Sequence, residues 1–145
     1  MIQKSDEKIK TDLTDFAYND LAEFYPYYGE LIYGRAYTIK KGRLRLAKEG
    51  EYVVGIASDS YGFALGAKQG KKIPIALTGI VLAFVDKIYK EGTALKVGGK
   101  GILTKANWFD KIFRQELVVG YFFKKERKKK INDIVVNGRH WVKVK

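Results

Sequence analysis

The sequence predicts a mainly β protein, a compact β-barrel or sandwich with an N-terminal arm or short helix and one short helix near residues 107–117. The first observation is the stretch from Glu51 to Val85, where short apolar, β-branched runs are bounded by glycines and by a lysine-rich turn at 67–72. Each run is too short for a core helix, so the runs are predicted to be buried strands. The second is that no linker or low-complexity segment interrupts the chain.

The bulk composition supports one folded domain. The chain has 145 residues, 46% hydrophobic and 14% aromatic, which excludes a disordered protein. No apolar run reaches the about 18–20 residues that a membrane span needs, and residues 1–6 lack the core of a signal peptide. The absence of cysteine excludes disulfides, thiol catalysis and thiolate metal sites. We therefore expect a soluble protein that is made in the cytoplasm.

The charge is high and unevenly spread. The formal net charge is +12, yet residues 1–30 contain three lysines against seven acidic residues, so the rest of the chain is strongly basic. A basic body indicates nucleic acid or an acidic protein surface as the partner. The alternative is a lysine-rich surface that is only solvated.

The first element predicted is an acidic N-terminal segment. Residues 6–24 place apolar side chains at mostly three- and four-residue steps with acids between them, which indicates an amphipathic helix or arm. We divide the chain into this arm or helix, residues 1–28, and a β-barrel domain, residues 29–145. Pro26 should break any helix at this point. The aromatic group around it either closes the barrel or forms a contact surface. The group is Phe24, Tyr25, Tyr27 and Tyr28.

Strands are predicted from Gly29 onward. A glycine inside a strand usually marks a bulge or corner, so the long run at 73–85 is expected to bend at Thr78-Gly79. Asn137-Gly138, between two apolar alternations, is the best hairpin signal in the chain. The predicted strands are 31–39, 43–47, 52–57, 73–85, 93–97, 102–104, 117–123, 131–136 and 141–144.

Residues 106–117 depart from the strand pattern. Asn107 is suited to cap a helix start, and the apolar residues after it then share one face. We expect a short helix or lid that covers one mouth of the barrel. Its apolar face consists of Trp108, Phe109, Ile112, Phe113 and Leu117.

The candidates for chemistry are weak. Ser58-Asp59-Ser60 places hydroxyls beside a carboxylate, but no activating base is identified, so a β-turn built on these side chains is the better interpretation. His140 is the sole histidine, which excludes a histidine metal cluster. The run at 98–101 lacks the spacing of a phosphate-binding loop and is predicted to be a hairpin turn. We expect no catalytic residues, no metal and no cofactor.

The sharpest charge feature is the segment 124–130, with six basic residues and one acid. Phe122 and Phe123 precede it, so stacking and phosphate-contacting groups stand together. An exposed hairpin tip needs such solubilising charge in any case, and a solvated tip is the favoured interpretation. Acidic proteins and nucleic acid are the alternative partners. The candidate binding residues are Lys124, Lys125, Arg127, Lys128, Lys129 and Lys130.

Several glycine-centred segments follow one another in a recognisable order. They include Tyr33-Gly34-Arg35, Val53-Val54-Gly55-Ile56-Ala57-Ser58, Ile75-Ala76-Leu77-Thr78-Gly79-Ile80-Val81 and the closing Trp141-Val142-Lys143-Val144. This order resembles the small β-barrel modules of tailed-phage virions, which occur in head-decoration proteins and in C-terminal parts of tail fibres and appendages. The resemblance covers roughly residues 20–145. Gly92-Thr93 stands where such modules often have Gly-Asp.

The resemblance implies a phage or prophage virion protein without catalysis, made in the cytoplasm of the bacterial host. The favoured hypothesis is capsid decoration through contacts with the major capsid protein or other virion proteins, as a homo-oligomer, with a trimer as the guess and no membrane partner. An acidic arm beside a basic body offers complementarity between copies.

Three alternatives remain. The first is a component of a tail fibre or baseplate appendage. The second is a nucleic-acid-binding β-barrel that uses Arg43, Arg45 and the basic segment. The third is an autoproteolytic appendage domain that cuts itself near a serine, for which Ser58 or Ser60 is the matching position. Because little sequence precedes these serines, self-cleavage is not expected.

Overall fold

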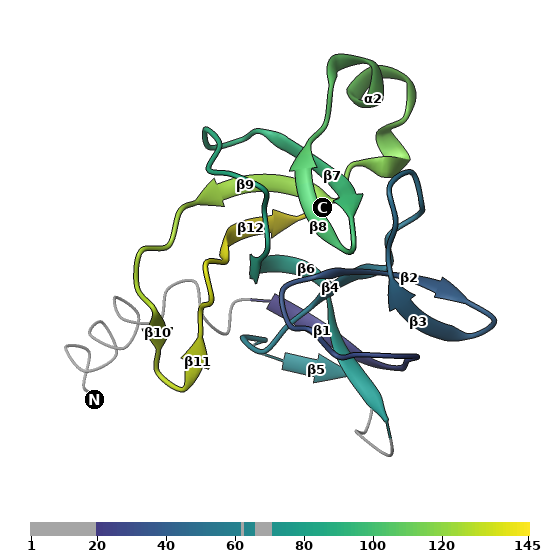
Figure 1. The fold of residues 1–145 in the computed structure, drawn as a ribbon, viewed down its shortest axis with the longest axis vertical. Helices are drawn as coiled ribbons and strands as arrows, with labels where there is room; N and C mark the ends of the chain where they lie inside the picture. The colour runs from purple at the N-terminus through teal and green to yellow at the C-terminus, as the bar shows by residue number, and fades with distance from the viewer. Residues whose placement is uncertain (1–19, 62, 66–70) are drawn as a thin grey trace, which may run out of the picture.

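The computed structural model describes residues 20–61, 63–65 and 71–145, and the protein in it is mainly β (Figure 1). Within these residues, ten strands form one curled, largely antiparallel sheet, a half-barrel with one short α-helix. The strands of this sheet are β1 (Asp20–Pro26), β2 (Ala36–Lys40), β3 (Arg43–Leu46), β4 (Gly55–Ala57), β5 (Phe63–Leu65), β6 (Lys72–Ala83), β7 (Ala94–Gly99), β8 (Ile102–Lys105), β9 (Gly120–Lys124) and β12 (His140–Val144).

Strand β6 joins the two halves of the sheet. The strand order is β3-β2-β4-β6-β12-β9-β7-β8, and β1 also pairs with β6 and, in parallel, with β5. Strand β1 pairs with β6 from Lys72 to Gly79, and β12 pairs with β6 from Gly79 to Ala83. Gly79 has a φ of 100°, a conformation open to glycine and costly for other residues. The bend expected at Thr78-Gly79 is thus the point where one continuous strand changes partner.

The two ends of the sheet approach each other at the turn between β7 and β8. The backbone N–H of Ala36 donates to the carbonyl of Gly101 at 2.8 Å, and the N–H of Gly101 donates to the carbonyl of Ala47 at 2.9 Å. These two bonds connect the β8 end of the sheet to β2 and to the residue after β3. The sheet therefore curls far enough to enclose a core.

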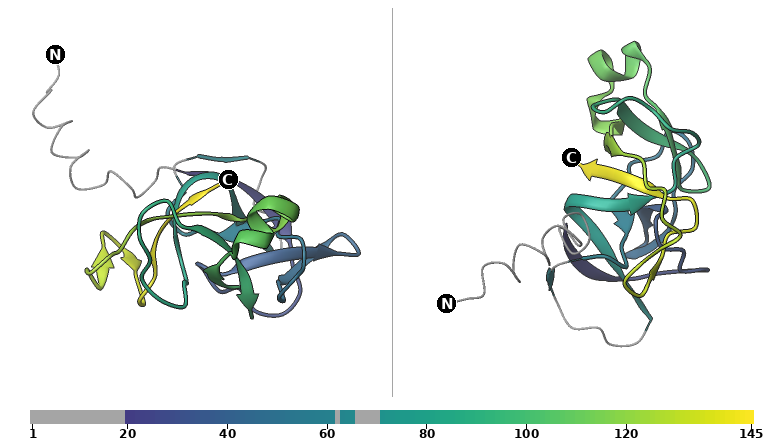
Figure 2. Two further views of the ribbon diagram at one scale, coloured as in Figure 1. Left: turned by 90° about the horizontal axis from the view of Figure 1, so that it is seen from above. Right: turned by 90° about the vertical axis from the view of Figure 1, so that its left-hand side faces the viewer.

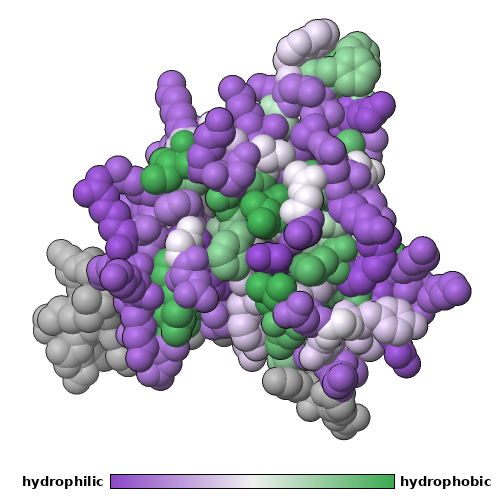
Figure 3. Space-filling view, in the orientation of Figure 1, coloured by the Kyte–Doolittle hydropathy of each residue, from purple (hydrophilic) through white to green (hydrophobic). Residues whose placement is uncertain are grey.

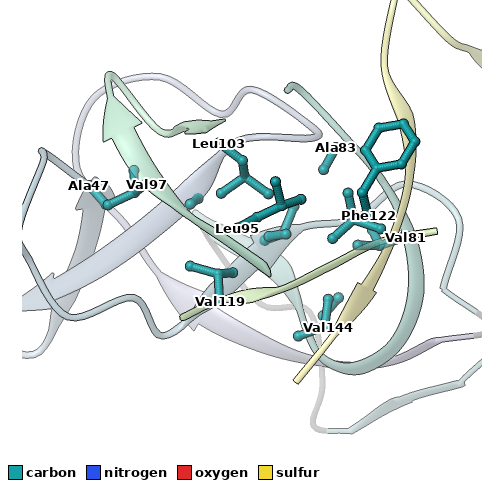
Figure 4. Close-up of a cluster of buried hydrophobic side chains, with 13 residues drawn as sticks. Ala47, Val81, Ala83, Leu95, Val97, Leu103, Val119, Phe122 and Val144 are labelled. Atoms are coloured by element: carbon teal, nitrogen blue, oxygen red, sulfur yellow. The ribbon is translucent and has the colours of Figure 1, made fainter. Parts of the chain in front are cut away.

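The main core lies inside this curl (Figure 4). Its side chains come from both halves of the sheet and include Val81, Leu95, Leu103, Phe122 and Val142, all 2% exposed or less. Burial of aliphatic and aromatic side chains on this scale is the chief stabilising term of such a fold. The short alternating runs of the sequence supply these residues.

Three predicted strands start later than expected, and one of them, 117–123, begins only at Gly120, after the 3-10 helix at 115–117. The segment 31–39 begins as a turn, because Gly34 has a φ of 92° and Arg35 N–H donates to the carbonyl of Ile32 at 3.3 Å. Regular pairing begins only at Ala36. Likewise the segment 52–57 is in the sheet only from Gly55, where β4 meets β6.

The helix predicted over 6–24 is wrong in its last part. Residues 1–19 lie outside the described residues, but from Asp20 the chain is strand β1, which pairs with β6. Asp20 and Ala22 are buried and their neighbours are partly exposed, an alternation that fits a strand. The division into residues 1–28 and 29–145 remains a prediction.

The Asn-Gly hairpin is also wrong. A hairpin does form, but it joins β10 (Lys130–Ile131) to β11 (Ile134–Val135) in a separate two-stranded sheet. Asn132, with a φ of 53°, lies between these two strands. Asn137 and Gly138 do adopt the positive φ of a turn, yet the strand that follows pairs with β6 and β9.

The helix near 107–117 is confirmed and its role as a lid is not. Helix α2 (Trp108–Phe113) is followed by the 3-10 helix Gln115–Leu117. Asn107 caps α2 in a reciprocal capping box with Asp110, as its sequence position predicted. The aromatic face, however, points to solvent, because Asp110 is the one buried residue of α2.

Among the described residues, no helix is long and apolar enough to cross a membrane.

Candidate functional site

The predicted aromatic group is largely part of the fold. Phe24 and Tyr25 lie on β1 and, like Tyr27, are partly buried. Tyr25 and Tyr27 pack against a core cluster on β2, β3 and β6, and Phe24 meets Tyr61 edge to face at 6.1 Å. Only Tyr28 is exposed, at 48%, with the guanidinium of Arg43 4.9 Å from its ring centre. The group therefore offers one exposed ring as a contact.

The predicted basic segment connects β9 to β10 and its six cations are exposed. Its one acid anchors it. Glu126 accepts a hydrogen bond from Trp141 Nε1 at 2.8 Å, and its own N–H donates to His140 Nδ1 at 3.0 Å. Burial lowers the pKa of His140, which keeps the imidazole a neutral acceptor. The segment is thus a fixed connection with a basic outer surface, and the predicted hairpin tip is wrong.

The aromatic group and the basic segment lie on different parts of the sheet. The first belongs to β1 and its neighbours β2 and β3, and the second to the connection from β9 to the small β10–β11 sheet (Figure 1). They do not form one site.

A third set of residues does meet, at Ser58. The Oγ of Ser58 donates to Asp20 Oδ2 at 2.6 Å and accepts from the backbone N–H of Ser60 at 3.1 Å. Ser58 and Ser60 are fully buried, and Asp20 is 5% exposed. The bond ties β1 to the connection between β4 and β5. The predicted Asp-Ser turn is confirmed in part, since Ser58 bonds to the backbone two residues on.

Burial raises the pKa of Asp20 to about 6, the hydrogen bond from Ser58 opposing this shift and the nearby Asp59 adding to it. Its second oxygen, Oδ1, has no hydrogen-bond partner and is buried. An unpartnered carboxyl oxygen in the interior lowers the stability of the folded state more when the group is charged than when it is protonated. Near neutral pH the carboxylate of Asp20 is therefore charged, and this buried charge lowers the stability of the fold.

Beside this pair, Arg139 forms a fork with Asp59. Arg139 Nη1 donates to Asp59 Oδ1 at 2.8 Å and Nη2 to Oδ2 at 3.0 Å. Its Nε donates to the carbonyl of Val136 at 2.9 Å, and Nη2 also donates to that of Val135. Arg139 is 2% exposed, and a bidentate pair of this kind is both strong and directional. It fastens the start of β12 to the connection after β4.

A hollow of about 540 Å³ opens beside Arg139. Its walls mix apolar residues with Asp59, Asp133 and Asn137. Neither Ser58 nor Asp20 lines it. Within the described ranges, no three His, Cys, Asp or Glu residues are placed to hold a metal ion.

These geometries favour a structural clasp. A buried carboxylate that accepts from a serine hydroxyl is the start of a nucleophilic pair. Ser58, however, has no exposed surface, so no external substrate reaches its hydroxyl. What the arrangement does is hold three separate segments together.

Sequence reasoning missed the two partners that complete this cluster. Asp20 lies in the segment predicted to be an amphipathic helix or arm, and Arg139 is not among the predicted site residues. Asp20 lies 38 residues from Ser58, and Arg139 lies 80 residues from Asp59. No local pattern marks such pairs.

Two solved structures share this fold. One is the crystal structure of the pre-mature bacteriophage phi29 gene product 12, with 16% identity and a TM-score of 0.62 over 87% of this chain and 21% of that chain. The other is the crystal structure of the C-terminal fragment of the same gene product, with 16% identity and a TM-score of 0.61 over 86% of this chain and 98% of the fragment. No family model and no curated protein sequence matches the chain.

The chain thus spans about a fifth of the first structure and nearly all of the C-terminal fragment. At this identity the likeness establishes the fold. It confirms, at that level, the resemblance to a β module of bacteriophage proteins that the glycine-centred segments indicated.

Proposed function

We propose that this protein is a structural component of a phage tail appendage and that it works as a homo-oligomeric module of the virion. The observation that carries this proposal is the fold likeness over 86% of the chain to the C-terminal fragment of a bacteriophage protein. The resemblance seen in the sequence names the same kind of module at the C-terminal ends of tail fibres and appendages.

Capsid decoration is the less well supported assignment, although the sequence favoured it. The structure that matches 86% of this chain is a C-terminal fragment of a phage gene product, and in the resemblance seen in the sequence such C-terminal parts belong to tail fibres and appendages. We therefore place the module on the tail and retain other virion proteins as its partners.

We propose further that the module is not an enzyme. The hydroxyl of Ser58 is buried and already bonded to Asp20, which supports a role in stability. Intact mass of the purified full chain tests the autoproteolytic alternative, since a single species of the full mass excludes cleavage at Ser58 or Ser60.

Nucleic-acid binding is less well supported than the sequence suggested. Of the two strand arginines assigned to it, Arg45 is held by Glu51 through two hydrogen bonds of 3.1 and 2.5 Å. A guanidinium held in this way is costly to transfer to a phosphate. Only Arg43 and the basic segment remain for that role.

Immunogold labelling of purified virions of the encoding phage tests the proposal. We expect gold at the tail and none on tailless heads purified from the same lysate. Gold spread over the head shell would restore capsid decoration. Particles without label would place the protein outside the virion and refute the proposal.

A further inference from the structure

Helix α2 carries its acidic residue inside and its large apolar residues outside. Asp110 is buried, whereas four large apolar side chains on the same helix are exposed. Soluble helices normally show the opposite pattern, with the apolar stripe facing the core. The exposed residues are Trp108 at 66%, Phe109 at 43%, Ile112 at 60% and Phe113 at 64%.

This orientation is fixed by polar contacts. Lys96 Nζ on β7 pairs with Asp110 Oδ2 at 2.8 Å, and the Lys96 bond lowers the pKa of Asp110. The capping box with Asn107 holds the first turn. Because this ion pair ties the buried Asp110 side of the helix to the partly exposed Lys96 of β7, the outward aromatic face is a built feature of the fold.

The exposed side chains form one knob at an end of the molecule. The rings of Phe109 and Phe113 lie 5.0 Å apart, and Trp108 meets Phe109 edge to face at 6.1 Å. The helix projects past the strands in the side view (Figure 2), and apolar side chains extend at that end of the surface (Figure 3). A contiguous apolar patch of this kind marks an interaction site. We call these four residues the α2 knob.

The same chain has a groove of mixed polarity that accommodates part of the knob. The groove holds about 340 Å³. An apolar cavity of about 150 Å³ accepts one benzene ring, so this groove takes about two aromatic rings. It is lined mostly by valines and other apolar residues of β4, β6 and β12 and of the segments beside them: Tyr52, Val53, Val54, Gly55, Leu77, Val118, Val119 and Val144, with Glu116 and Lys145.

Charge at the two surfaces is compatible with their contact. The knob is flanked by the exposed cations Lys111 and Arg114, and the groove carries the exposed carboxylate of Glu116. The groove also carries the cation of Lys145, whose Nζ donates to the carbonyl of Gln115 at 2.7 Å, so the groove is close to neutral overall. Direct knob-to-knob contact would instead bring the cations of two copies together, which is unfavourable.

We propose that the α2 knob of one copy docks in the groove of a second copy of this chain. Glu116 follows α2 by three residues, so knob and groove lie on neighbouring faces. Neighbouring contact surfaces permit a closed assembly, whereas surfaces at opposite ends favour open chains. The inference deepens the proposed function, since it gives the oligomeric module its contact.

Matched single variants test the knob. Phe113→Ser and Ile112→Ser remove exposed apolar groups, and Ile88→Ser is the control because Ile88 is similarly exposed, at 55%, in the loop after β6. Truncating a large apolar side chain at the centre of an interface weakens association by about tenfold or more when that side chain is a hot spot. By sedimentation velocity we expect the wild type and Ile88→Ser to be oligomers, and both knob variants to dissociate while keeping the wild-type far-UV circular dichroism spectrum.

Complementation tests the pairing of knob with groove. Tyr52→Lys blocks the groove with a cation at a position that is 62% exposed, so folding is not at risk. Phe113→Ser keeps an intact groove and Tyr52→Lys keeps an intact knob. Each variant alone should be monomeric, and an equimolar mixture should recover a dimer. A mixture that stays monomeric overturns the proposal.

The absence of cysteine provides a second measurement. Ile112→Cys in one preparation and Glu116→Cys in another should be joined by a bismaleimide when they are mixed, and much less when Ile88→Cys replaces the knob cysteine. Equal cross-linking of both pairs refutes the knob as the contact.

Binding of the α2 knob to a different partner would give a different experimental result. A wild-type chain that is monomeric at every concentration, and that binds vesicles of anionic phospholipid in a Trp108-dependent manner, refutes docking of a second copy. Gold at the tail together with full oligomerisation of Phe113→Ser refutes this inference and leaves the proposed function intact. If virions carry no label while Phe113→Ser loses its oligomers, the proposed function is refuted and this inference stands.

Discussion

Asp20 is the residue whose ionisation bears most on stability. Its folded pKa, about 6, lies above the unfolded value of 3.8, so the folded state binds more protons between these pH values. The free energy of unfolding contributed by this group is therefore greatest below about pH 4 and falls as the pH rises to about 6. A shift of about two pKa units corresponds to about 3 kcal/mol.

We expect Asp20→Asn to remove that dependence. The difference in unfolding free energy between wild type and variant should change by about 2–3 kcal/mol from pH 4 to pH 7, in the direction that favours the variant at the higher pH. Urea denaturation across this range measures it. Asp133→Asn, on the exposed β10–β11 turn, is the control, and a pH-independent difference for Asp20→Asn contradicts the account.

Arg139 allows a test of geometry separate from charge. Arg139→Lys keeps the positive charge but loses the fork to Asp59 and the Nε bond to Val136. We expect a loss of about 2–3 kcal/mol in unfolding free energy, the scale of charge-assisted hydrogen bonds. Arg127→Lys, in the exposed basic segment, should change it by less than about 0.5 kcal/mol. Equal effects in chemical denaturation would show that the fork adds nothing.

Among the elements, the pairing of β9 with β12 depends on a close backbone approach. A Cβ placed on Gly120 would lie 2.2 Å from the carbonyl oxygen of Lys143 on β12. Gly120→Ala must therefore separate the strands, and we expect a loss of about 1–3 kcal/mol. Gly99→Ala on β7 meets nothing within 4 Å and should be nearly neutral. Thermal melting of the two variants compares them, and similar melting temperatures would contradict the steric argument.

The sequence predicted those elements whose signal is local. Short apolar runs between glycines and turns marked β6, β7, β8 and β12 to within two residues, and Asn107 marked the start of α2. These signals work because a strand or cap is specified by adjacent residues.

The features that the sequence did not predict share a cause: each depends on contacts with residues far away in the sequence. Apolar spacing up to Phe24 suits a helix as well as a strand, and pairing with β6 decides the matter. The apolar face of α2 was recognised, but Lys96 on β7 determines that it points outward. The Ser58 cluster needed Asp20, and the fork needed Arg139, both far away in the sequence.

At the scale of the whole molecule, the two halves of the sheet should unfold together. Strand β6 is paired with β1 and β4 in one half and with β12 in the other. Because β6 belongs to both halves and the main core takes side chains from both, a single transition is expected. In Trp108→Phe, fluorescence reports Trp141, which is 1% exposed on β12. Its unfolding curve should coincide with far-UV circular dichroism, and separate midpoints would show independent halves.

The position of β12 has a mechanical consequence. This strand lies between β6 and β9 and is bonded to both. A load applied along its axis acts on two rows of hydrogen bonds in shear, so many of them must rupture at once. A hairpin such as β10–β11, pulled open from its ends, loses its bonds one after another. The fold therefore resists tension at the last strand far better than at the small hairpin that precedes it.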